Sequence, residues 1–498
     1  MSDIRRFIQQ EQDTAISSGL QQFSELPGWL ASTKDHDRTC KVLSKDIPEI
    51  ADGSVILTKC RIGHMLLKDG VWQNLCILKV GIPDESGERT MEFNGTLFPP
   101  GFLSIDQTVV EGVFGAQGWH AIFPDLNLEL RTPEPETELE SFGMLTDPET
   151  SREFLEHSLS GASHAYRSVH IQSCKPEIIR YKPGNRCTVL YHLEYAPDMP
   201  VDDHGPAIVV AKTYLQEKGR NAYESMKALW DASFGSSNSV RIAEPLAYDP
   251  DLRVFVQGPV WEEQTLADLF LSALDAGTPE AIEALNEAMR KTAMGLAELH
   301  RSGVKIGQAE TWEDEMAEVQ AQMVQLSTVF PNLSSAAGSF LERISRLEAA
   351  ALRDPLVPSH GTFRPVQVLL NKGEVSFIDF DSFCQSEPAR DLAMFLSSLM
   401  TLGLTLSSFD KGKSSDQTIA DPANWEARFE QVSSVCEQFL DVYQQLQPVS
   451  RQRVALWEAL NLFYYVLSGW MKVKVSEISF LVKLLDRFLI ASHLIDVR

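Results

Sequence analysis

Residues 366–380 constrain the fold more than any other stretch of the chain, because they predict a β-hairpin in an otherwise helical region. Two short apolar runs flank Asn371-Lys372-Gly373, a good hairpin turn since Asn and Gly tolerate a positive φ. From Thr265 onward the rest of the sequence has the apolar spacing of helices. A helical lobe whose only sheet is one short hairpin is an uncommon arrangement, so the hairpin indicates a small group of folds.

Strand-like runs dominate the first half of the chain. Four of them lie between residues 52 and 131 and are separated by turn-rich pieces, which is typical of an antiparallel sheet. This pattern predicts an N-terminal β-rich domain over residues 1–165. A second strand cluster, with one helix at 217–234, predicts a small lobe over residues 166–260. Residues 261–498 form the predicted helical large lobe, so the expected class is α+β.

Length and charge limit the classes of function. A chain of 498 residues is too long for one compact core and predicts two or three domains. Its formal net charge is −25, from 69 acidic and 44 basic residues. Such a surface repels a polyanion, because nucleic-acid binding needs a basic face that releases counterions. We therefore expect no nucleic-acid partner.

Cysteine usage and apolar stretches indicate the compartment. The seven cysteines are scattered and never form a Cys-x-x-Cys pair, which fits reduced thiols better than disulfides or a zinc site. The first residues lack the apolar core of a signal peptide. Two long apolar stretches, 392–409 and 459–471, are respectively too polar and too short to span a bilayer. We expect a cytoplasmic protein that has no membrane partner and in which both stretches are buried helices.

The order of these features resembles the protein-kinase-like fold. It combines a strand lysine, a helix, a His-Gly loop, a hairpin and an aspartate, and this order is more specific than any single motif. More narrowly, the sequence is similar to the aminoglycoside phosphotransferase and choline kinase family over about residues 168–498. The family's catalytic loop reads roughly His-Gly-Asp-x-x-x-x-Asn, whereas residues 360–367 read His-Gly-Thr-Phe-Arg-Pro-Val-Gln. The implied architecture is a bilobal kinase-like fold with an additional N-terminal β-rich domain.

The resemblance implies roles for several residues. His360 and Gly361 begin the catalytic loop, and Asp391 in the following Pro-Ala-Arg-Asp phrase would brace it. Asp379 matches the aspartate that holds Mg²⁺ against the nucleotide phosphates. His360 is better explained as a structural residue that fixes the loop than as a catalytic one. Asp379 has the alternative of a structural cap after the hairpin.

Further nucleotide contacts follow from the small lobe. Lys212 lies where the family's phosphate-binding lysine belongs, although a strand lysine between apolar residues is often a snorkelling edge residue. Glu224 on the next helix could pair with it, in competition with Glu217 or with an ordinary solvated role. Gly184 lies in a Lys-Pro-Gly-Asn turn that fits either a phosphate loop or a plain hairpin turn. Gln257 lies in the connection 256–265, where the adenine is expected.

Two departures from the family pattern affect the chemistry. Thr362 stands where the family has its catalytic aspartate, and a threonine hydroxyl cannot accept a proton at neutral pH. Gln367 stands where the family has a metal-binding asparagine, but it keeps the amide oxygen and could still reach a hard cation. Arg364 lies two residues after Thr362, and its planar fork suits phosphate oxygens. The metal ligands expected from the sequence are Asp379 and Gln367.

These residues favour an ATP- and Mg²⁺-dependent phosphotransferase that acts on an unidentified small molecule. Losing a general base costs roughly 10²- to 10⁴-fold, so reaction is not excluded, and an anionic acceptor would need no base at all. One alternative is a pseudokinase that binds nucleotide, or nothing, and serves as a scaffolding or regulatory module. Its protein partner would bind the N-terminal domain. Another alternative is AMP transfer with ATP bound in reverse.

Overall fold

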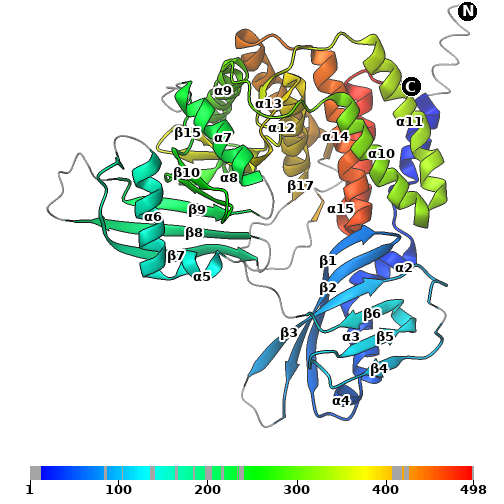
Figure 1. Cartoon of the computed structure of the whole chain (residues 1–498). Coiled ribbons are helices and arrows are strands. Elements are labelled where there is room, and N and C mark those ends of the chain that lie inside the picture. The colour runs from blue at the N-terminus through cyan, green and yellow to red at the C-terminus, as the bar shows by residue number, and fades with distance from the viewer. Residues whose placement is uncertain are drawn as a thin grey trace, which may run out of the picture.

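The fold of the chain comes from a computed structural model of all 498 residues. The structure describes residues 13–83, 87–103, 105–134, 141–162, 166–182, 186–196, 205–214, 218–232, 234, 240–406, 418–419 and 425–495. Figure 1 shows an N-terminal sheet, a second sheet with its own helices, and a large helical region. The mixed α+β class and the two kinase-like lobes behind a β-rich domain are confirmed.

The N-terminal sheet has six antiparallel strands in the order β1-β2-β3-β6-β5-β4. Its residues alternate between buried and exposed along β2, which is the pattern of a sheet with one face on a core. Helix α3 packs against β1 on the covered face. The strands are β1 (Ile56–Lys68), β2 (Val71–Gly81), β3 (Glu88–Leu97), β4 (Val109–Glu111), β5 (His120–Phe123) and β6 (Leu128–Arg131). The helices around them are α2 (Gly28–Ala31), α3 (His36–Asp46), α4 (Pro48–Ala51) and the short 3₁₀ helices η1 (Ser32–Lys34) and η2 (Pro124–Leu126).

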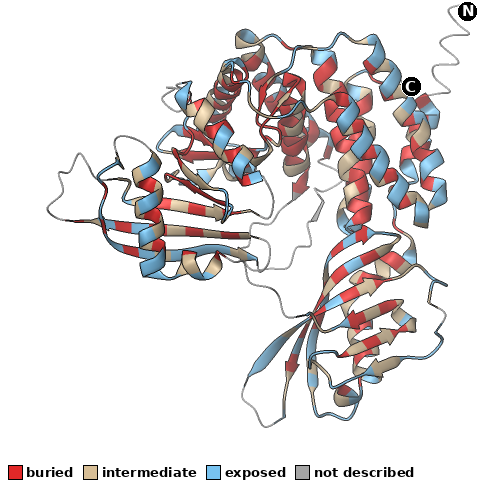
Figure 2. Ribbon diagram, in the orientation of Figure 1, coloured by how far each residue is buried: buried red, intermediate tan, exposed pale blue. Residues whose placement is uncertain are grey.

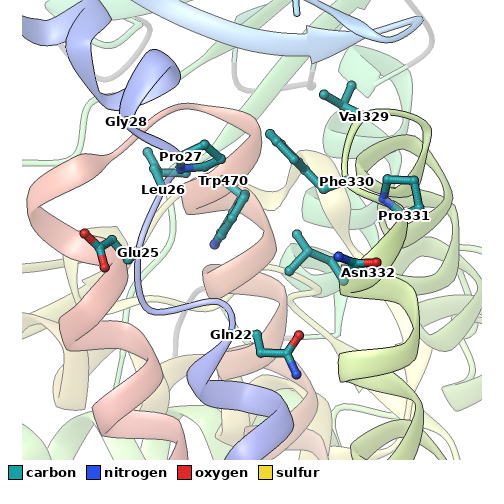
Figure 3. A pocket seen from close by; sticks show the side chains of 11 residues that line it. Gln22, Glu25, Leu26, Pro27, Gly28, Val329, Phe330, Pro331, Asn332 and Trp470 are labelled. Carbon is teal, nitrogen blue, oxygen red and sulfur yellow. The ribbon is translucent and has the colours of Figure 1, made fainter. Parts of the chain in front are cut away.

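The first described residues pack on the last helices of the chain, an arrangement that the sequence did not reveal. Residues 13–21 are helical, and the Ser17 hydroxyl donates to Asp486 at 2.5 Å. The indole Nε1 of Trp470 donates to the carbonyl oxygen of Phe23 at 2.8 Å. Figure 3 shows Trp470 and Phe330 beside the segment 26–28, and their ring centroids are 5.2 Å apart. The N-terminal region is thus joined to the helical lobe by a continuous core.

The second sheet has the antiparallel order β10-β11-β9-β8-β7 and forms the small lobe. Its strands are β7 (Ile171–Lys182), β8 (Arg186–Tyr195), β9 (Ile208–Thr213), β10 (Pro245–Asp249) and β11 (Val254–Gln257). Its helices are α5 (Phe142–Thr146), α6 (Pro148–Ala162) and α7 (Lys218–Asp231). Leu155 and Leu159 of α6 share a core cluster with Val209 and Ala211 of β9. Because α5 and α6 pack on this sheet, we propose that the first domain ends before α5; the boundary at 165 stays a prediction.

The large lobe is built from eight helices in the described part of the chain. They are α8 (Leu266–Ala276), α9 (Pro279–Arg301), α10 (Trp312–Val329), α11 (Pro331–Ala350), α12 (Pro388–Leu404), α13 (Trp425–Leu446), α14 (Arg451–Met471) and α15 (Val475–Ala491). Figure 2 shows buried residues concentrated where these helices pack together. Residues 459–471 lie in α14 and are largely buried, as expected. Of 392–409, the part through 404 is buried helix, and 407–409 lie outside the described residues.

The predicted hairpin is present as β14 (Val368–Asn371) and β15 (Glu374–Phe377). Asn371 pairs with Glu374, and the two turn residues Lys372 and Gly373 have φ of 48° and 79°. Lys372, and not Asn371, therefore adopts the left-handed conformation of this two-residue turn.

The hairpin is not the only sheet of the large lobe. The strand β12 (Gln264–Thr265) extends it, and further pairs are β13 (Val357–Ser359) with β16 (Cys384–Ser386) and β17 (Thr405–Leu406) with β18 (Thr418–Ile419). Among the described residues, no helix is both long and apolar enough to cross a membrane.

Candidate active site

The loop between β13 and β14 is held by a buried carboxylate. The backbone N–H groups of His360 and Gly361 donate to Asp391 at 2.6 and 2.9 Å. Asp391 lies in the first turn of α12, where the helix dipole favours a negative charge. Gly361 has a φ of 84°, and a Cβ there would lie 2.0 Å from the carbonyl oxygen of Ser382. Asp391 therefore braces the loop as the resemblance implied.

A second contact keeps Asp391 ionised. His300 of α9 contacts it through Nε2 at 3.2 Å and contacts the hydroxyl of Tyr443 through Nδ1 at 2.6 Å. Complete burial raises the pKa of Asp391, but the hydrogen bond and charge of His300 and the donors at His360 outweigh it, so the pKa is lowered overall. The loop anchor stays negative at neutral pH.

His360 is fully buried, and its side chain helps to fix the conformation of the loop. Its Nε2 contacts the carbonyl oxygen of Ile378 at 2.9 Å, and its ring lies 4.7 Å from that of Phe380. Its side chain thus links the loop to the segment that follows the hairpin. This geometry favours the structural reading of His360 over a catalytic one.

Asp379 follows β15 in a left-handed conformation, with φ 77° and ψ 52°. A non-glycine residue in this region is uncommon, and such strain clusters at functional sites. The amide Nε2 of Gln367, from the 3₁₀ helix η6 (Pro365–Gln367), donates to Asp379 Oδ2 at 3.2 Å. The structure thus brings together the two residues that the sequence assigned to a metal.

The residues Asp379 and Gln367 fit a hard cation. Gln367 is buried, and its amide oxygen Oε1 has no hydrogen-bond partner among the described residues. Carboxylate and amide oxygens are the donors that Mg²⁺ and Ca²⁺ prefer. No group of three or more His, Cys, Asp or Glu side chains in the described chain could hold a metal by itself. A cation here would need further oxygen ligands from a bound phosphate or from water.

Lys212 of β9 faces this carboxylate from the small lobe. Burial lowers the pKa of Lys212, while Asp379 and Asp381 oppose that change by favouring its charged form. Asp381 lies on the 3₁₀ helix η7 (Phe380–Ser382), and burial followed by repulsion from Asp379 raises the pKa of its carboxyl. The positive charges of Lys218 and Lys212 partly oppose this rise in the pKa of Asp381. A lysine and two carboxylates from opposite lobes therefore share one electrostatic site.

Glu224 does not join this site. It is exposed on α7, and no ion pair connects it with Lys212 within the described ranges. The same helix instead contributes Asn221, whose amide donates to the carbonyl oxygens of Asp381 and Phe383 at 3.2 and 3.1 Å. The predicted ion pair is replaced by these backbone contacts, which fix α7 to η7.

Gln257 lies where the small lobe connects to the large lobe. Gln257 is buried at the end of β11 and pairs with Val210 of β9. Two residues of the following connection are tied by backbone bonds: Gly258 N–H donates to Glu244 at 2.8 Å, and Glu263 N–H donates to Leu370 at 2.8 Å. The expected adenine region is thus the end of β11 and a connection that backbone hydrogen bonds hold at both ends. Gly184 lies outside the described residues.

Thr362 lines a polar cavity of about 770 Å³ between the lobes. Three carboxylates line it with Thr362, namely Glu310, Glu318 of α10 and Asp381. Burial, followed by repulsion from Glu315, raises the pKa of Glu318. The cavity can accept a cationic or hydroxylated molecule beside the loop.

The same cavity has two basic lining residues, Lys218 and Arg390. Arg390 is held between Glu315, at 3.2 Å, and the carbonyl oxygen of Gly361, at 3.0 Å. Its charge is therefore partly neutralised by a neighbouring acid, and the carboxylates dominate the cavity.

Arg364 lies elsewhere. It is exposed and lines a separate cavity of about 290 Å³ with Tyr465 and Lys474. Within the described chain it makes no hydrogen bond or ion pair with Asp379. The structure therefore does not bring Arg364 to the carboxylates that the sequence grouped with it.

Four residues of this site were missed by the sequence reasoning: Asn221, Glu318, Asp381 and Arg390. Asp381 and Arg390 carried a signal, since each lies within two residues of a motif position. Asn221 and Glu318 carried none, because only the packing of α7 and α10 brings them to the loop.

Part of the chain is similar in sequence to a known protein family. Residues 211–453 match the sequence model of a family described as the phosphotransferase enzyme family. None of the curated proteins compared with the chain matches it.

Several solved structures are also similar to this chain. A glucosamine kinase in complex with glucosamine, ADP and inorganic phosphate has 16% identity and a TM-score of 0.43, over 91% of this chain and 98% of that chain. A choline/ethanolamine kinase family protein from Mesorhizobium loti has 12% identity and a TM-score of 0.41, over 69% of this chain and 97% of that chain. A thermostable mutant of aminoglycoside phosphotransferase APH(4)-Ia has 15% identity and a TM-score of 0.41, over 68% and 98%. The family match covers the strand of Lys212, the loop and Asp379, so the resemblance that the motifs implied is confirmed over residues 211–453.

Proposed function

We propose that this protein is an ATP- and Mg²⁺-dependent phosphotransferase whose acceptor is a small molecule. The observation that carries the proposal is the convergence of Lys212, from the small lobe, with Asp379 and Asp381, from the large lobe. Holding a half-buried lysine opposite two carboxylates is costly unless its charge is used, so the arrangement suits a site for phosphate and metal. The family match over residues 211–453 supports the same reaction class.

We assign the charged groups as follows. Asp379 and Gln367 would hold Mg²⁺, since one supplies a carboxylate oxygen and the other an unpaired amide oxygen. When bound, the cation neutralises negative charge on the nucleotide phosphates. Lys212 binds phosphate oxygens as a point charge, a role in which lysine is common. His360 and Asp391 position the loop without touching the reacting atoms.

The cavity beside Thr362 is the proposed acceptor site. Its three carboxylates repel an anion, so the hypothesis of an anionic acceptor is disfavoured by the charge around the loop. A hydroxylated amine fits better, because its ammonium group can pair with Glu310 while its hydroxyl faces the loop and Glu318. A panel of amino alcohols and amino sugars should therefore be phosphorylated in preference to sugar acids and sugar phosphates.

We further propose that Glu318 accepts the proton that Thr362 cannot. Glu318 lines the same cavity as Thr362, and its raised pKa brings it closer to that of a useful general base at neutral pH. Asp381 is less suited, because it lies beside Asp379 and Lys212 at the metal end of the site.

Nucleotide binding can be tested by a thermal shift with ATP and Mg²⁺. Ligand at a hundred times its Kd should stabilise the wild type by about 2.7 kcal/mol. Lys212→Met and Asp379→Asn should each remove most of that shift. Lys227→Met is the matched control, because Lys227 pairs with Asp231 on the outer face of α7. An unchanged shift in both site variants would sink the assignment.

Turnover separates the enzyme from its alternatives. A nucleotide-dependent shift without any product from the acceptor panel would favour a pseudokinase that acts as a scaffolding module. A product heavier by AMP, and not by phosphate, would favour nucleotidyl transfer. The cytoplasmic location stays a prediction, and the seven cysteines, all free thiols in the structure, are consistent with it.

A further inference from the structure

Another cavity lies in the helical lobe, away from the cleft. It has a volume of about 800 Å³ and lies between α12, α13, α14 and α15. None of its lining residues lines the cavity beside Thr362. Its walls are mainly apolar and include Leu396, Met400, Phe429 and Phe488. The volume and the apolar lining are those of a small-molecule site.

One carboxylate interrupts these apolar walls. Glu458 lies in the middle of α14, is 5% exposed and lines the cavity. Among the described residues it has no hydrogen-bond or ion-pair partner. Arg453 lies five residues earlier on the same helix and is also buried, but it is fully paired with Glu348 and Glu387. Of these two buried ionisable residues on α14, Arg453 is therefore paired within the protein, whereas Glu458 is left facing the cavity.

No nearby cation neutralises Glu458. The other titratable residues that line the cavity are Glu430, Cys436, Glu437, Arg451 and His493. Arg451 is already paired with Glu437 and Asp441 and is 43% exposed. Burial raises the pKa of Glu458 well above its ordinary value, and the Glu437 carboxylate raises it further. Burial and the Glu437 carboxylate thus both disfavour the ionised form of Glu458.

We propose that the cavity between α12 and α15 binds a small organic cation, an ammonium group on an apolar body, whose charge pairs with Glu458. Burying an unpaired carboxylate costs free energy that the protein can avoid with any apolar residue, so its presence in a cavity needs a partner. The apolar walls would cover the body of the ligand, while the carboxylate selects an amine over a neutral analogue of the same shape. Such a site shares no residue with the cavity proposed for the phosphate acceptor.

Binding of an ammonium group would also change the protonation of Glu458. If Glu458 is neutral in the empty cavity, the arrival of an ammonium group ionises it, because an opposite charge at contact distance lowers the pKa of a carboxyl. One proton then leaves Glu458 for the solvent, and the amine keeps its own. Binding should therefore release up to one proton for each molecule bound, and the release should decrease as the pH rises.

The test is calorimetric titration with benzylamine and with benzyl alcohol, each in two buffers of different ionisation enthalpy. Benzylamine should bind the wild type with proton release, and benzyl alcohol should bind more weakly with none. Glu458→Gln keeps the shape of the side chain. It should lower the affinity for benzylamine at least about tenfold, since the loss of one partner of a buried pair is costly. It should also abolish the proton release.

Two further variants keep the test decisive. Glu430→Gln is the matched control, because Glu430 lines the same cavity but is exposed, and it should leave the affinity unchanged. Ala455→Phe fills the cavity from α14 and should remove benzylamine binding even if Glu458→Gln does not fold. Equal benzylamine affinity in the wild type and in Glu458→Gln, or in the wild type and Ala455→Phe, would overturn the proposal.

Discussion

Gly361 shows how closely the loop is packed against the segment after the hairpin. Its φ of 84° and the nearby Ser382 oxygen leave no room for a side chain. We expect Gly361→Ala to lower the free energy of unfolding by at least about 1–3 kcal/mol, the usual cost of a residue held in an unfavourable backbone region. Urea unfolding measures the change. Activity should fall as well, because the substitution displaces the loop.

A second alanine substitution serves as the control for Gly361→Ala. Gly338 lies in α11, and an added Cβ would meet nothing within 4 Å. Alanine there should stabilise the protein by about 0.5–1 kcal/mol, since glycine is unfavourable inside a helix. If both variants changed stability equally, the packing argument for Gly361 would fail.

A second prediction concerns Thr362, which stands where the family has its catalytic aspartate. If Glu318 is the proton acceptor, Glu318→Gln should lower kcat by about 10²- to 10⁴-fold. Thr362→Asp should then restore part of that loss in the double variant, because it returns a carboxylate to the loop. Steady-state kinetics with the best acceptor of the panel measures both effects.

Glu313→Gln is the control for this pair of variants. Glu313 lies on the same helix as Glu318 but pairs with Arg353 near the surface, so its loss should leave kcat unchanged. An undiminished kcat in Glu318→Gln would show that the base lies elsewhere.

Residue types predicted part of the site and not the rest. The sequence predicted that Gln367 and Asp379 lie together, because both belong to one loop and hairpin where spacing fixes their neighbourhood, and the two side chains are in contact. Arg364 has the right chemistry in the right loop, yet its side chain lines another cavity. The orientation of an exposed side chain is not fixed by its place in a motif. Glu318 was missed because only the docking of α10 brings it near Thr362.

Among the elements, α14 carries a buried ionic junction. Arg453 donates to Glu387 at 2.7 Å and to Glu348 at 2.9 Å, so it ties α14 to the start of α12 and to α11. We expect Arg453→Met to cost about 3–5 kcal/mol, because it leaves buried carboxylates without their partner. Chemical denaturation measures the loss.

Two comparisons sharpen this prediction. Arg451→Met removes an ion pair at a half-exposed position on the same helix and should cost only about 0–1 kcal/mol. Adding Glu387→Gln to Arg453→Met should recover part of the stability, since it removes one unpaired charge. A cost for Arg453→Met no larger than that for Arg451→Met would contradict the role of the junction.

Element types were more predictable than element packing. The hairpin, the two strand clusters and the helix before β10 follow from local spacing and turn residues, and the structure confirms them. The turn itself uses Lys372 in place of Asn371, because the strands pair as far as Asn371 and Glu374. The helices between residues 13 and 51 were not foreseen, since the long strand runs after them dominated the pattern.

Across the whole molecule, the N-terminal segment and the last helices form one core. Phe23 is fully buried, and its ring lies 5.7 Å from that of Phe463 and 6.1 Å from that of Trp470. We expect Phe23→Ala to cost about 3–5 kcal/mol, as for other buried aromatic truncations. Hydrogen exchange should speed up in α14, far along the chain from the substitution.

Phe102→Ala is the control for this effect. Phe102 is 61% exposed in the N-terminal domain, and its truncation should change stability by no more than about 0.5 kcal/mol. Unchanged protection of α14 in Phe23→Ala would show that the N-terminal domain is independent of the helical lobe. This coupling could not be predicted from sequence, because no local pattern indicates which distant surface an apolar helix will cover.

The bond between Trp470 and Phe23 also bears on how the protein is made. The two residues are 447 positions apart, so at roughly 5–20 residues per second a ribosome needs on the order of 20–90 s to supply the partner. During that interval Ile16, Leu20 and Phe23, all buried in the finished protein, have no native surface to cover them. The six-stranded sheet can pair meanwhile, because its first three strands are sequential neighbours. Until α14 and α15 emerge, this apolar segment is exposed and prone to aggregation, so its folding must wait for the last part of the lobe to be made.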